Sequence, residues 1–287
     1  MKRSVFFLCI YRIFILVAFN FFLASANAQS FKDSWTIFYE SYYKPLPQPV
    51  LASSFWLSLS NKVFKPEGDG PFPAVVLIHT AGGLANEHIK VHAQNLLAKG
   101  YVVLIQDSLG PRKISVVKST TPEVHPPIGV KDAYEGWAFL SKQSYVDKER
   151  IYQMGTSWGG FVASALGSKG IAEVSQAKGR FRASVGLYST CNLGQFDPYR
   201  YIFPDTDRPV LLLLAGADKE LLHRGQGDCF KELEDLKSKG LPIEYHVYEG
   251  VGHAWDKKGE TMLGYIYNDA VTKDSFQRAI DFFERNK

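Results

Sequence analysis

Short runs of apolar residues alternate along this chain with stretches of helical periodicity. The apolar runs cover Ala74–Ile78, Val102–Ile105, Ile151–Met154, Ala183–Leu187, Val210–Leu214 and Ile243–Tyr248. Several of them are apolar at successive positions, as is typical of strands covered on both faces. The helical stretches cover His88–Lys99, Val130–Ser141, Trp158–Gly167, Cys229–Lys239 and Lys273–Arg285. This alternation predicts right-handed βαβ units, and therefore an α/β fold with a mostly parallel central sheet and helices on both faces.

The N-terminal part of the chain differs from this alternating region. A proline-containing segment, Lys44–Pro49, precedes a strand region that we expect around Phe55–Phe64. No linker composition separates any later part of the chain. We therefore expect residues 29–287 to form a single domain, with residues 29–65 as its N-terminal lead-in.

Residues 1–28 have the pattern of a secretory signal peptide. Lys2 and Arg3 precede an apolar run over residues 5–23, and Ala-Asn-Ala at residues 26–28 supplies a small-residue cleavage site. A retained membrane anchor is the alternative, because the run approaches the roughly 20 residues that span a bilayer. Arg12 within the run and the small-residue ending favour removal, so we expect export to the periplasm or the medium.

Removal of this segment changes the charge and the cysteine content. The formal net charge falls from +4 to +1, because three basic residues and no acidic ones lie within residues 1–28. A nearly neutral protein argues against a nucleic-acid partner, and we expect no stable membrane span after removal. Of the three cysteines, Cys191 and Cys229 remain. An oxidising compartment favours a disulfide between them, and two buried free thiols are the alternative.

One short motif lies at a predicted strand-to-helix junction. The run Ile151–Met154 leads into Gly-Thr-Ser-Trp-Gly at residues 155–159, after which a helix is expected. In such a G-x-S-x-G elbow the serine occupies a strained turn, and the residues two positions away are small so that strand and helix can approach. Glycine and serine are common in ordinary turns as well, but the flanking strand and helix make Ser157 a candidate nucleophile.

A serine nucleophile needs a general base, and the base needs an acid that orients it. For this kind of elbow the acid precedes the histidine in the chain. Asp218 and His253 each lie just after a predicted strand, on loops where open α/β sheets bind ligands. The expected catalytic residues are therefore Ser157, Asp218 and His253.

Each of these two partners has alternatives. Glu220 is another candidate for the acid, and Asp218 has the position of a helix cap as well. Of the other histidines downstream, His246 falls within a predicted strand. His223 lies too few residues after Asp218 to fold back over the serine, which leaves His253 as the preferred base.

Acyl transfer also requires N–H donors for the developing oxyanion. The backbone N–H of Trp158, directly after the serine, is one candidate, and the second usually comes from a loop after an earlier strand. That loop begins at His79 and continues through Thr80 and Ala81 into two glycines. We expect the N–H of Thr80 or Ala81 to serve as the second donor, and His79 to be a structural hydrogen-bonding residue.

Three further residues are candidates for contact with substrate. Arg112, on the loop after a predicted strand, is a candidate ligand of a substrate carboxylate, with a structural ion pair as the alternative. Trp158 and Trp255 flank the serine and the histidine and are candidates for an aromatic wall, unless they simply pack. The sequence has no metal-binding motif and no phosphate-binding loop, so we expect neither a metal nor another cofactor.

From about Pro66 onward the chain resembles the dienelactone hydrolase family of α/β-hydrolases. Besides the elbow, the resemblance rests on four segments: GPFPAVVLIH (70–79), DSLGPR (107–112), DAY (132–134) and GVGHAW (250–255). It implies an α/β-hydrolase fold with Ser157 as nucleophile, Asp218 as acid and His253 as base. Dienelactone hydrolases proper have a cysteine nucleophile. Exported relatives tend to carry cysteines near the positions of Cys191 and Cys229.

We therefore expect an exported serine hydrolase that cleaves a small-molecule ester or lactone through an acyl-enzyme. A serine peptidase of the prolyl-oligopeptidase type is one alternative, although this chain has no room for a propeller domain. A binding protein that has kept the fold without the chemistry is another, although the ordered serine, acid and histidine argue against it. The sequence leaves the oligomeric state open.

Overall fold

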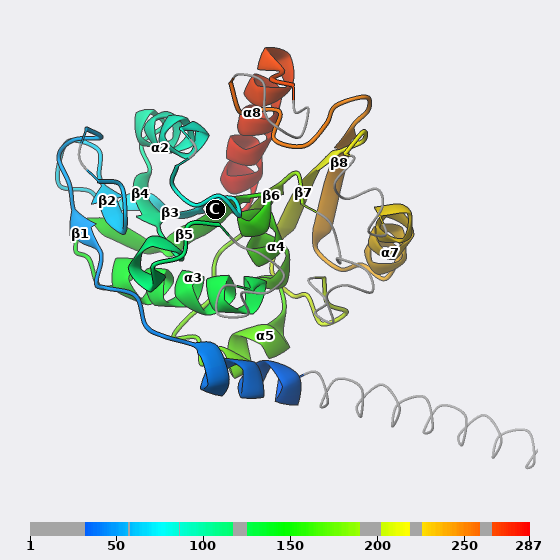
Figure 1. The fold of residues 1–287 in the computed structure, drawn as a ribbon, viewed down its shortest axis with the longest axis horizontal. Coiled ribbons are helices and arrows are strands. Elements are labelled where there is room, and N and C mark those ends of the chain that lie inside the picture. The colour runs from blue at the N-terminus through cyan, green and yellow to red at the C-terminus, as the bar shows by residue number, and fades with distance from the viewer. Residues whose placement is uncertain are drawn as a thin grey trace, which may run out of the picture.

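The described part of the computed structural model comprises residues 32–56, 58–85, 87–116, 125–189, 202–218, 226–258 and 266–287. Within these ranges an eight-stranded sheet is covered by helices on both faces (Figure 1). The strand order is β1-β2-β4-β3-β5-β6-β7-β8, and all neighbouring strands are parallel except β2 and β4. The predicted α/β architecture with a mostly parallel sheet is confirmed.

The strands follow the apolar runs of the sequence closely. They are β1 (Val50–Leu51), β2 (Lys62–Phe64), β3 (Phe72–Ile78), β4 (Val102–Gln106), β5 (Val146–Thr156), β6 (Ser184–Leu187), β7 (Val210–Ala215) and β8 (Ile243–Tyr248). The strand region expected over Phe55–Phe64 is reduced to β2. Its first half folds back instead, so that the ring of Phe55 stacks on that of Phe64 at 3.9 Å.

The helices also lie close to their predicted positions. They are α2 (His88–Ala98), α3 (Pro126–Leu140), α4 (Trp158–Ala165), α5 (Lys169–Val174), α7 (Gln226–Ser238) and α8 (Asp269–Arg285), with a 3₁₀ turn, η1, at Gly110–Arg112. Helix α3 begins four residues before its predicted start. Two prolines occupy its first turn, where their missing N–H groups cost no helical hydrogen bond. Residues 32–42 are also helical.

The sheet separates two hydrophobic layers. On one face, Val75 and Leu77 of β3 pack with residues of α2 and α8. On the other face, Val76 and Ile78 pack with residues of α3, α4 and α5. Figure 1 shows α2 and α8 above the sheet and α3 and α5 below it. Alternate side chains of one strand therefore enter opposite layers, as the continuous apolar runs predict.

Some of the sequence-based predictions fall outside the described residues. These are the signal peptide over residues 1–28, Cys191, Glu220 and His223. Cys229 is buried on α7, and its pairing with Cys191 stays a prediction. Across the described ranges, none of the helices combines the length and apolar character that a bilayer span requires.

Candidate active site

Ser157 alone forms the turn between β5, which ends at Thr156, and α4, which begins at Trp158. Its backbone has φ 51° and ψ −110°, a conformation that is costly for a residue with a Cβ. Hydrogen bonds on both sides hold it there: its N–H donates to the carbonyl of Leu187 at 2.9 Å, and its carbonyl accepts from Gly160 at 2.8 Å. The strained elbow expected from the motif is present.

The two glycines of the motif are required by close backbone contacts. A Cβ on Gly155 would lie 2.1 Å from the carbonyl oxygen of Gly159. A Cβ on Gly159 would lie 2.4 Å from the carbonyl oxygen of Ile78. The N–H of Gly159 also donates to the carbonyl of His79 at 3.1 Å, which joins the start of α4 to the end of β3. Only glycine at both positions lets strand and helix approach in this way.

Ser157, His253 and Asp218 are brought together from loops at the carboxyl ends of β5, β8 and β7. Nε2 of His253 is 2.8 Å from Oγ of Ser157. Nδ1 of the same ring is 2.6 Å from Oδ2 of Asp218. The Asp218 side chain is fully buried and the His253 side chain is 6% exposed, so water competes little for either bond.

These contacts determine the positions of the protons. An ionised carboxylate only accepts hydrogen bonds, so Nδ1 of His253 carries the proton that Asp218 accepts. In the neutral ring Nε2 is then the acceptor, and the Ser157 hydroxyl donates to it. This arrangement suits removal of the serine proton by the imidazole.

Backbone hydrogen bonds also connect the loops of the acid and the histidine. The N–H of Ala217 donates to the carbonyl of Val251 at 2.9 Å, and the N–H of Gly216 donates to that of Tyr248 at 3.0 Å. The segment before Asp218 is therefore tied to the segment before His253. These two backbone bonds support the short contact between the side chains of Asp218 and His253.

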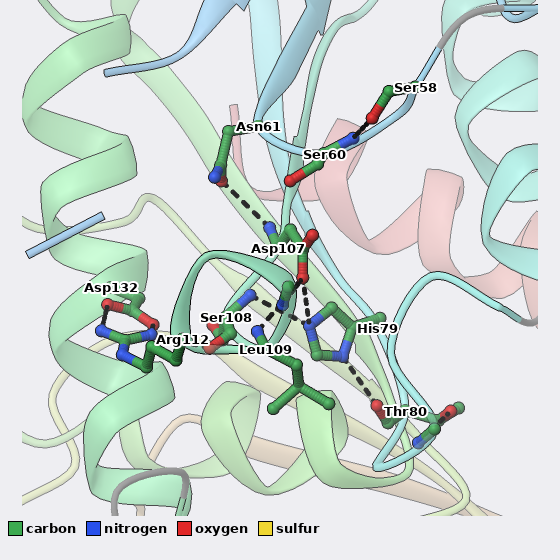
Figure 2. A network of polar contacts seen from close by, with 12 residues as sticks. Ser58, Ser60, Asn61, His79, Thr80, Asp107, Ser108, Leu109, Arg112 and Asp132 are labelled. Carbon is green, nitrogen blue, oxygen red and sulfur yellow. Dashed lines mark hydrogen bonds and ion pairs between the residues drawn. The ribbon is translucent and has the colours of Figure 1, made fainter. Parts of the chain in front are cut away.

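The loop expected to supply the second oxyanion donor is organised around His79 (Figure 2). Nε2 of this ring accepts from the N–H of Ser108 at 3.1 Å, so the proton lies on Nδ1, which donates to the carbonyl of Thr80 at 2.6 Å. The same carbonyl accepts from the N–H of Gly83 at 3.0 Å. These bonds fix the peptide group that carries the N–H of Ala81. Which N–H, of Thr80 or Ala81, binds an oxyanion stays a prediction.

His79 is a structural residue, as the sequence indicated. It is fully buried, and burial lowers the pKa of its imidazole, so the ring is neutral. Its ring stacks on that of Trp158 at 5.4 Å, with 10° between the planes. Trp158 is itself buried. The stack therefore connects the loop after β3 to the first residue of α4, whose N–H is the other expected oxyanion donor.

Arg112 forms the structural ion pair that was the alternative to its expected role in substrate binding. Both terminal nitrogens bind Asp132 of α3, at 2.7 and 2.9 Å, and both side chains are nearly inaccessible (Figure 2). One of these nitrogens also donates to the carbonyl of Ser108 at 2.8 Å, and the other to that of Lys44. Both terminal nitrogens of the guanidinium group are therefore occupied by protein acceptors.

Replacement of Arg112 by alanine is expected to reduce the free energy of unfolding by about 3–5 kcal/mol, because the buried Asp132 loses its counter-charge. Urea unfolding of both proteins measures the change. A double variant, Arg112→Met with Asp132→Leu, is expected to recover much of the loss, since no charge then remains buried. Unchanged stability together with a raised KM for carboxylate-bearing esters would restore the substrate-binding role.

Trp255 does not form a wall of the site either. It is fully buried, its Nε1 donates to Oγ of Ser275 on α8 at 3.2 Å, and its ring packs against Tyr188 and Tyr248. The position next to the histidine was correctly located, but the side chain belongs to the core between the sheet and α8.

Sequence reasoning missed a polar cluster next to Ser157, His253 and Asp218. His92 and His88 of α2 lie beside Asp256, which follows His253 in the same turn. Neither ring nitrogen of His88 has a hydrogen-bond partner, although the residue is only 5% exposed. The available signal was the i, i+4 spacing of the two histidines on a predicted helix.

His88 predicts a pH dependence of stability. Burial lowers the pKa of His88 from 6.5 to about 4. The unfolded chain therefore binds this proton at a higher pH than the folded protein, so stability falls as the pH drops from about 6.5 towards 4. The loss is at most about 3 kcal/mol, and His88→Phe is expected to reduce it. Melting temperatures of both proteins between these pH values test this; equal losses would contradict it.

Within the described ranges, no group of three or more histidine, cysteine or acidic side chains is arranged to hold a metal ion. The site consists of a hydroxyl, an imidazole and a carboxylate in line, at the edge of the sheet where the parallel strands end. That combination is suited to nucleophilic attack on a carbonyl group.

Comparisons with known proteins agree with this fold. Esterase EstD of Thermotoga maritima is 25% identical over 251 residues, which cover 68% of this chain and 57% of that protein. The chain thus spans little more than half the length of this relative. A putative dienelactone hydrolase from Klebsiella pneumoniae superposes with a TM-score of 0.59 at 20% identity, covering 76% of this chain and 89% of that one. Esterase 2 of Thermogutta terrifontis, with butyrate bound, gives 0.56 at 15% identity, covering 78% and 87%.

A family comparison covers most of the chain. It matches residues 59–286, a range that includes β2 to β8 and all three side chains of the Ser157–His253–Asp218 arrangement. The chain belongs to the dienelactone hydrolase family.

Proposed function

We propose that this protein is a serine hydrolase that cleaves carboxylic esters or lactones of small molecules through an acyl-enzyme. The observation that carries the proposal is the continuous hydrogen-bonded line from Ser157 through His253 to Asp218, at 2.8 and 2.6 Å. Membership of the dienelactone hydrolase family and the similarity to an esterase support the ester bond as the target.

The chemistry follows from the proton positions. Nε2 of His253 takes the Ser157 proton while Oγ attacks the carbonyl carbon, and the resulting oxyanion accepts N–H bonds from Trp158 and from Thr80 or Ala81. The imidazolium then gives the proton to the departing alkoxide, which leaves as the alcohol. Water, deprotonated by the same ring, attacks the acyl-enzyme, and the proton held by the ring then returns to Oγ of Ser157 as the acyl–oxygen bond breaks. The product leaves as the carboxylic acid and releases its remaining proton to solvent.

A serine nucleophile fits a general esterase or lactonase. Activation by a neighbouring imidazole is what a hydroxyl requires, because it is almost entirely protonated at neutral pH. Hydrolysis of a series of p-nitrophenyl esters from acetate to decanoate, a set of lactones and a prolyl p-nitroanilide peptide tests the proposal. We expect turnover of esters or lactones only. Turnover of the peptide alone would assign the protein to the serine peptidases, and no turnover at all would favour a binding protein.

We further propose that residues 1–28 are removed during export and that Cys191 and Cys229 form a disulfide in the exported protein. The basic start, apolar run and Ala-Asn-Ala ending support removal, and the burial of Cys229 suits a structural bridge. N-terminal sequencing of protein from the exported fraction is expected to begin at Gln29. Alkylation without reduction is expected to leave both cysteines unmodified; their modification in the denatured protein would exclude the bridge.

A further inference from the structure

A second pair of carboxylate and imidazole lies next to the triad. Asp256 belongs to the turn over residues 253–256 that begins with His253. Its Oδ2 is 2.6 Å from Nε2 of His92 on α2, and its Oδ1 accepts from the hydroxyl of Tyr188 at 2.9 Å. The side chains of Asp256, His92 and Tyr188 are all buried. Two residues that are far apart in the chain therefore bind the same carboxylate.

Tyr188 connects this carboxylate to the ring of His253. The two rings meet edge to face, with centroids 4.9 Å apart and 67° between their planes. Tyr188 directly follows β6 with φ 39°, and its N–H donates to the carbonyl of Leu213 at 2.7 Å. Its other neighbour is Trp255, also at 4.9 Å. A ring held on these sides cannot shift without moving His253 or releasing Asp256.

His92 connects the same carboxylate to the other side of the site. It lies on α2, the helix that follows the loop through Thr80 and Gly83. Asp256 is therefore the meeting point of three segments: the turn of the general base, the end of β6 and the helix after the expected oxyanion loop. Because an ionised carboxylate only accepts hydrogen bonds, the His92 nitrogen that faces Asp256, Nε2, carries a proton.

Asp256 is ionised in the folded protein. Burial by itself opposes ionisation, but His88, His92 and the Tyr188 hydroxyl outweigh it and lower the pKa of Asp256 to about 2. A second negative charge in the turn of His253 favours the imidazolium that forms when the ring takes the Ser157 proton, because opposite charges attract strongly where water is excluded.

We propose that Asp256, held by His92 and Tyr188, is a positioning residue for His253: it keeps the imidazole aligned with both Ser157 and Asp218 and favours its protonated form during catalysis. This inference rests on the proposed function of His253 as the general base. Asp256 itself touches no reacting atom, so its effect is transmitted through the turn and through the ring of Tyr188.

The variant Asp256→Asn keeps the shape of the side chain and removes its charge. We expect kcat for ester hydrolysis to fall by about 10- to 100-fold with KM little changed, because a displaced catalytic group affects the reaction step more than binding. The acid limb of the kcat/KM profile is expected to shift as well, because the charge that is removed lies in the same turn as the general base.

The other titratable and charged groups around this turn must be considered in reading that shift. They are Asp218, Lys257, His88, His92 and Tyr188. Two variants of His92 test the positioning of Asp256 while leaving the charge of Asp256 in place. His92→Gln keeps an N–H donor for Asp256 and is expected to retain most of the activity. His92→Leu removes the donor and is expected to lose activity as Asp256→Asn does.

Proton NMR of the histidine rings tests the inference without any substrate. The wild-type protein is expected to show a low-field Nδ1–H resonance from the 2.6 Å contact of His253 with Asp218, assigned by its loss in His253→Gln. In Asp256→Asn this resonance is expected to move or broaden, and the pH dependence of the His253 ring signals to change. If Asp256→Asn does not fold, the same resonance is measured in Tyr188→Phe, which keeps the ring and removes the hydrogen bond to Asp256.

An unchanged His253 resonance and titration in a folded Asp256→Asn or Tyr188→Phe variant, together with unchanged kcat, would overturn the inference. A lower melting temperature with all these properties unchanged would also overturn it, by showing a purely structural role. If the wild-type protein hydrolyses no ester but its His253 signals still depend on Asp256, the positioning role stands and the proposed function fails.

Discussion

Replacement of Ser157 by alanine is expected to reduce ester hydrolysis by roughly 10⁴- to 10⁶-fold, because the attacking oxygen is lost and the remaining groups only bind and polarise the carbonyl. The substitution removes one atom, Oγ, whose contact is with Nε2 of His253 at 2.8 Å. The elbow backbone is held by Leu187 and Gly160 and not by that oxygen, so the fold should be retained. Initial rates on the best p-nitrophenyl ester measure the loss.

Ser164 provides a matched control for this variant. It lies on the same helix, is buried, and its hydroxyl donates to the carbonyl of Gly160 at 3.0 Å. Ser164→Ala is expected to change the rate only a few-fold, since local bonds to the helix backbone contribute little to catalysis. Loss of activity in both variants would point to damage of α4, and retention in Ser157→Ala would exclude Ser157 as the nucleophile.

Replacement of Asp218 by asparagine is expected to lower kcat by about 10⁴-fold with the fold intact. An asparagine amide that donates to Nδ1 of His253 forces the ring proton onto Nε2. Nε2 can then no longer accept the Ser157 proton, although all the groups remain in place. Steady-state kinetics, with the circular dichroism spectrum as a check on the fold, measure the effect.

Asp274 on α8 is the control for this change. It is partly exposed, binds Arg278 at 2.6 Å, and Asp274→Asn is expected to leave kcat nearly unchanged. Asp256→Asn should fall between the two aspartate variants. Near-normal kcat in Asp218→Asn would assign the acid to another residue, with Glu220→Gln as the next variant to measure.

The apolar runs predicted the sheet well because buried parallel strands need apolar residues on both faces. The helix over residues 32–42 was missed, since its aromatic residues also suit strands. Its signal was present in Trp35, Phe38 and Tyr39, which have helical spacing and are buried. Helix α5 is only six residues long, too short for a clear periodicity.

The candidate site was predictable where the chemistry depends on chain order and strand ends. Ser157, Asp218 and His253 each follow a strand, and parallel strands bring such positions together. The orientation of a side chain is not encoded in this way. Arg112 and Trp255 were placed on the correct loops, but one pairs with Asp132 and the other enters the core. The spacing of His88 and His92 was a signal for a polar helix face, but their partner Asp256 lies 164 positions after His92, so no local pattern indicated the bond.

Intact-protein mass spectrometry after incubation with a fluorophosphonate tests most directly whether Ser157 is a nucleophile activated by His253. One phosphonyl adduct per chain is expected, located on Ser157 by peptide mapping, absent from Ser157→Ala and much slower to form in His253→Gln. An adduct on another residue, or none on a folded protein, would contradict the assignment of Ser157 as the nucleophile.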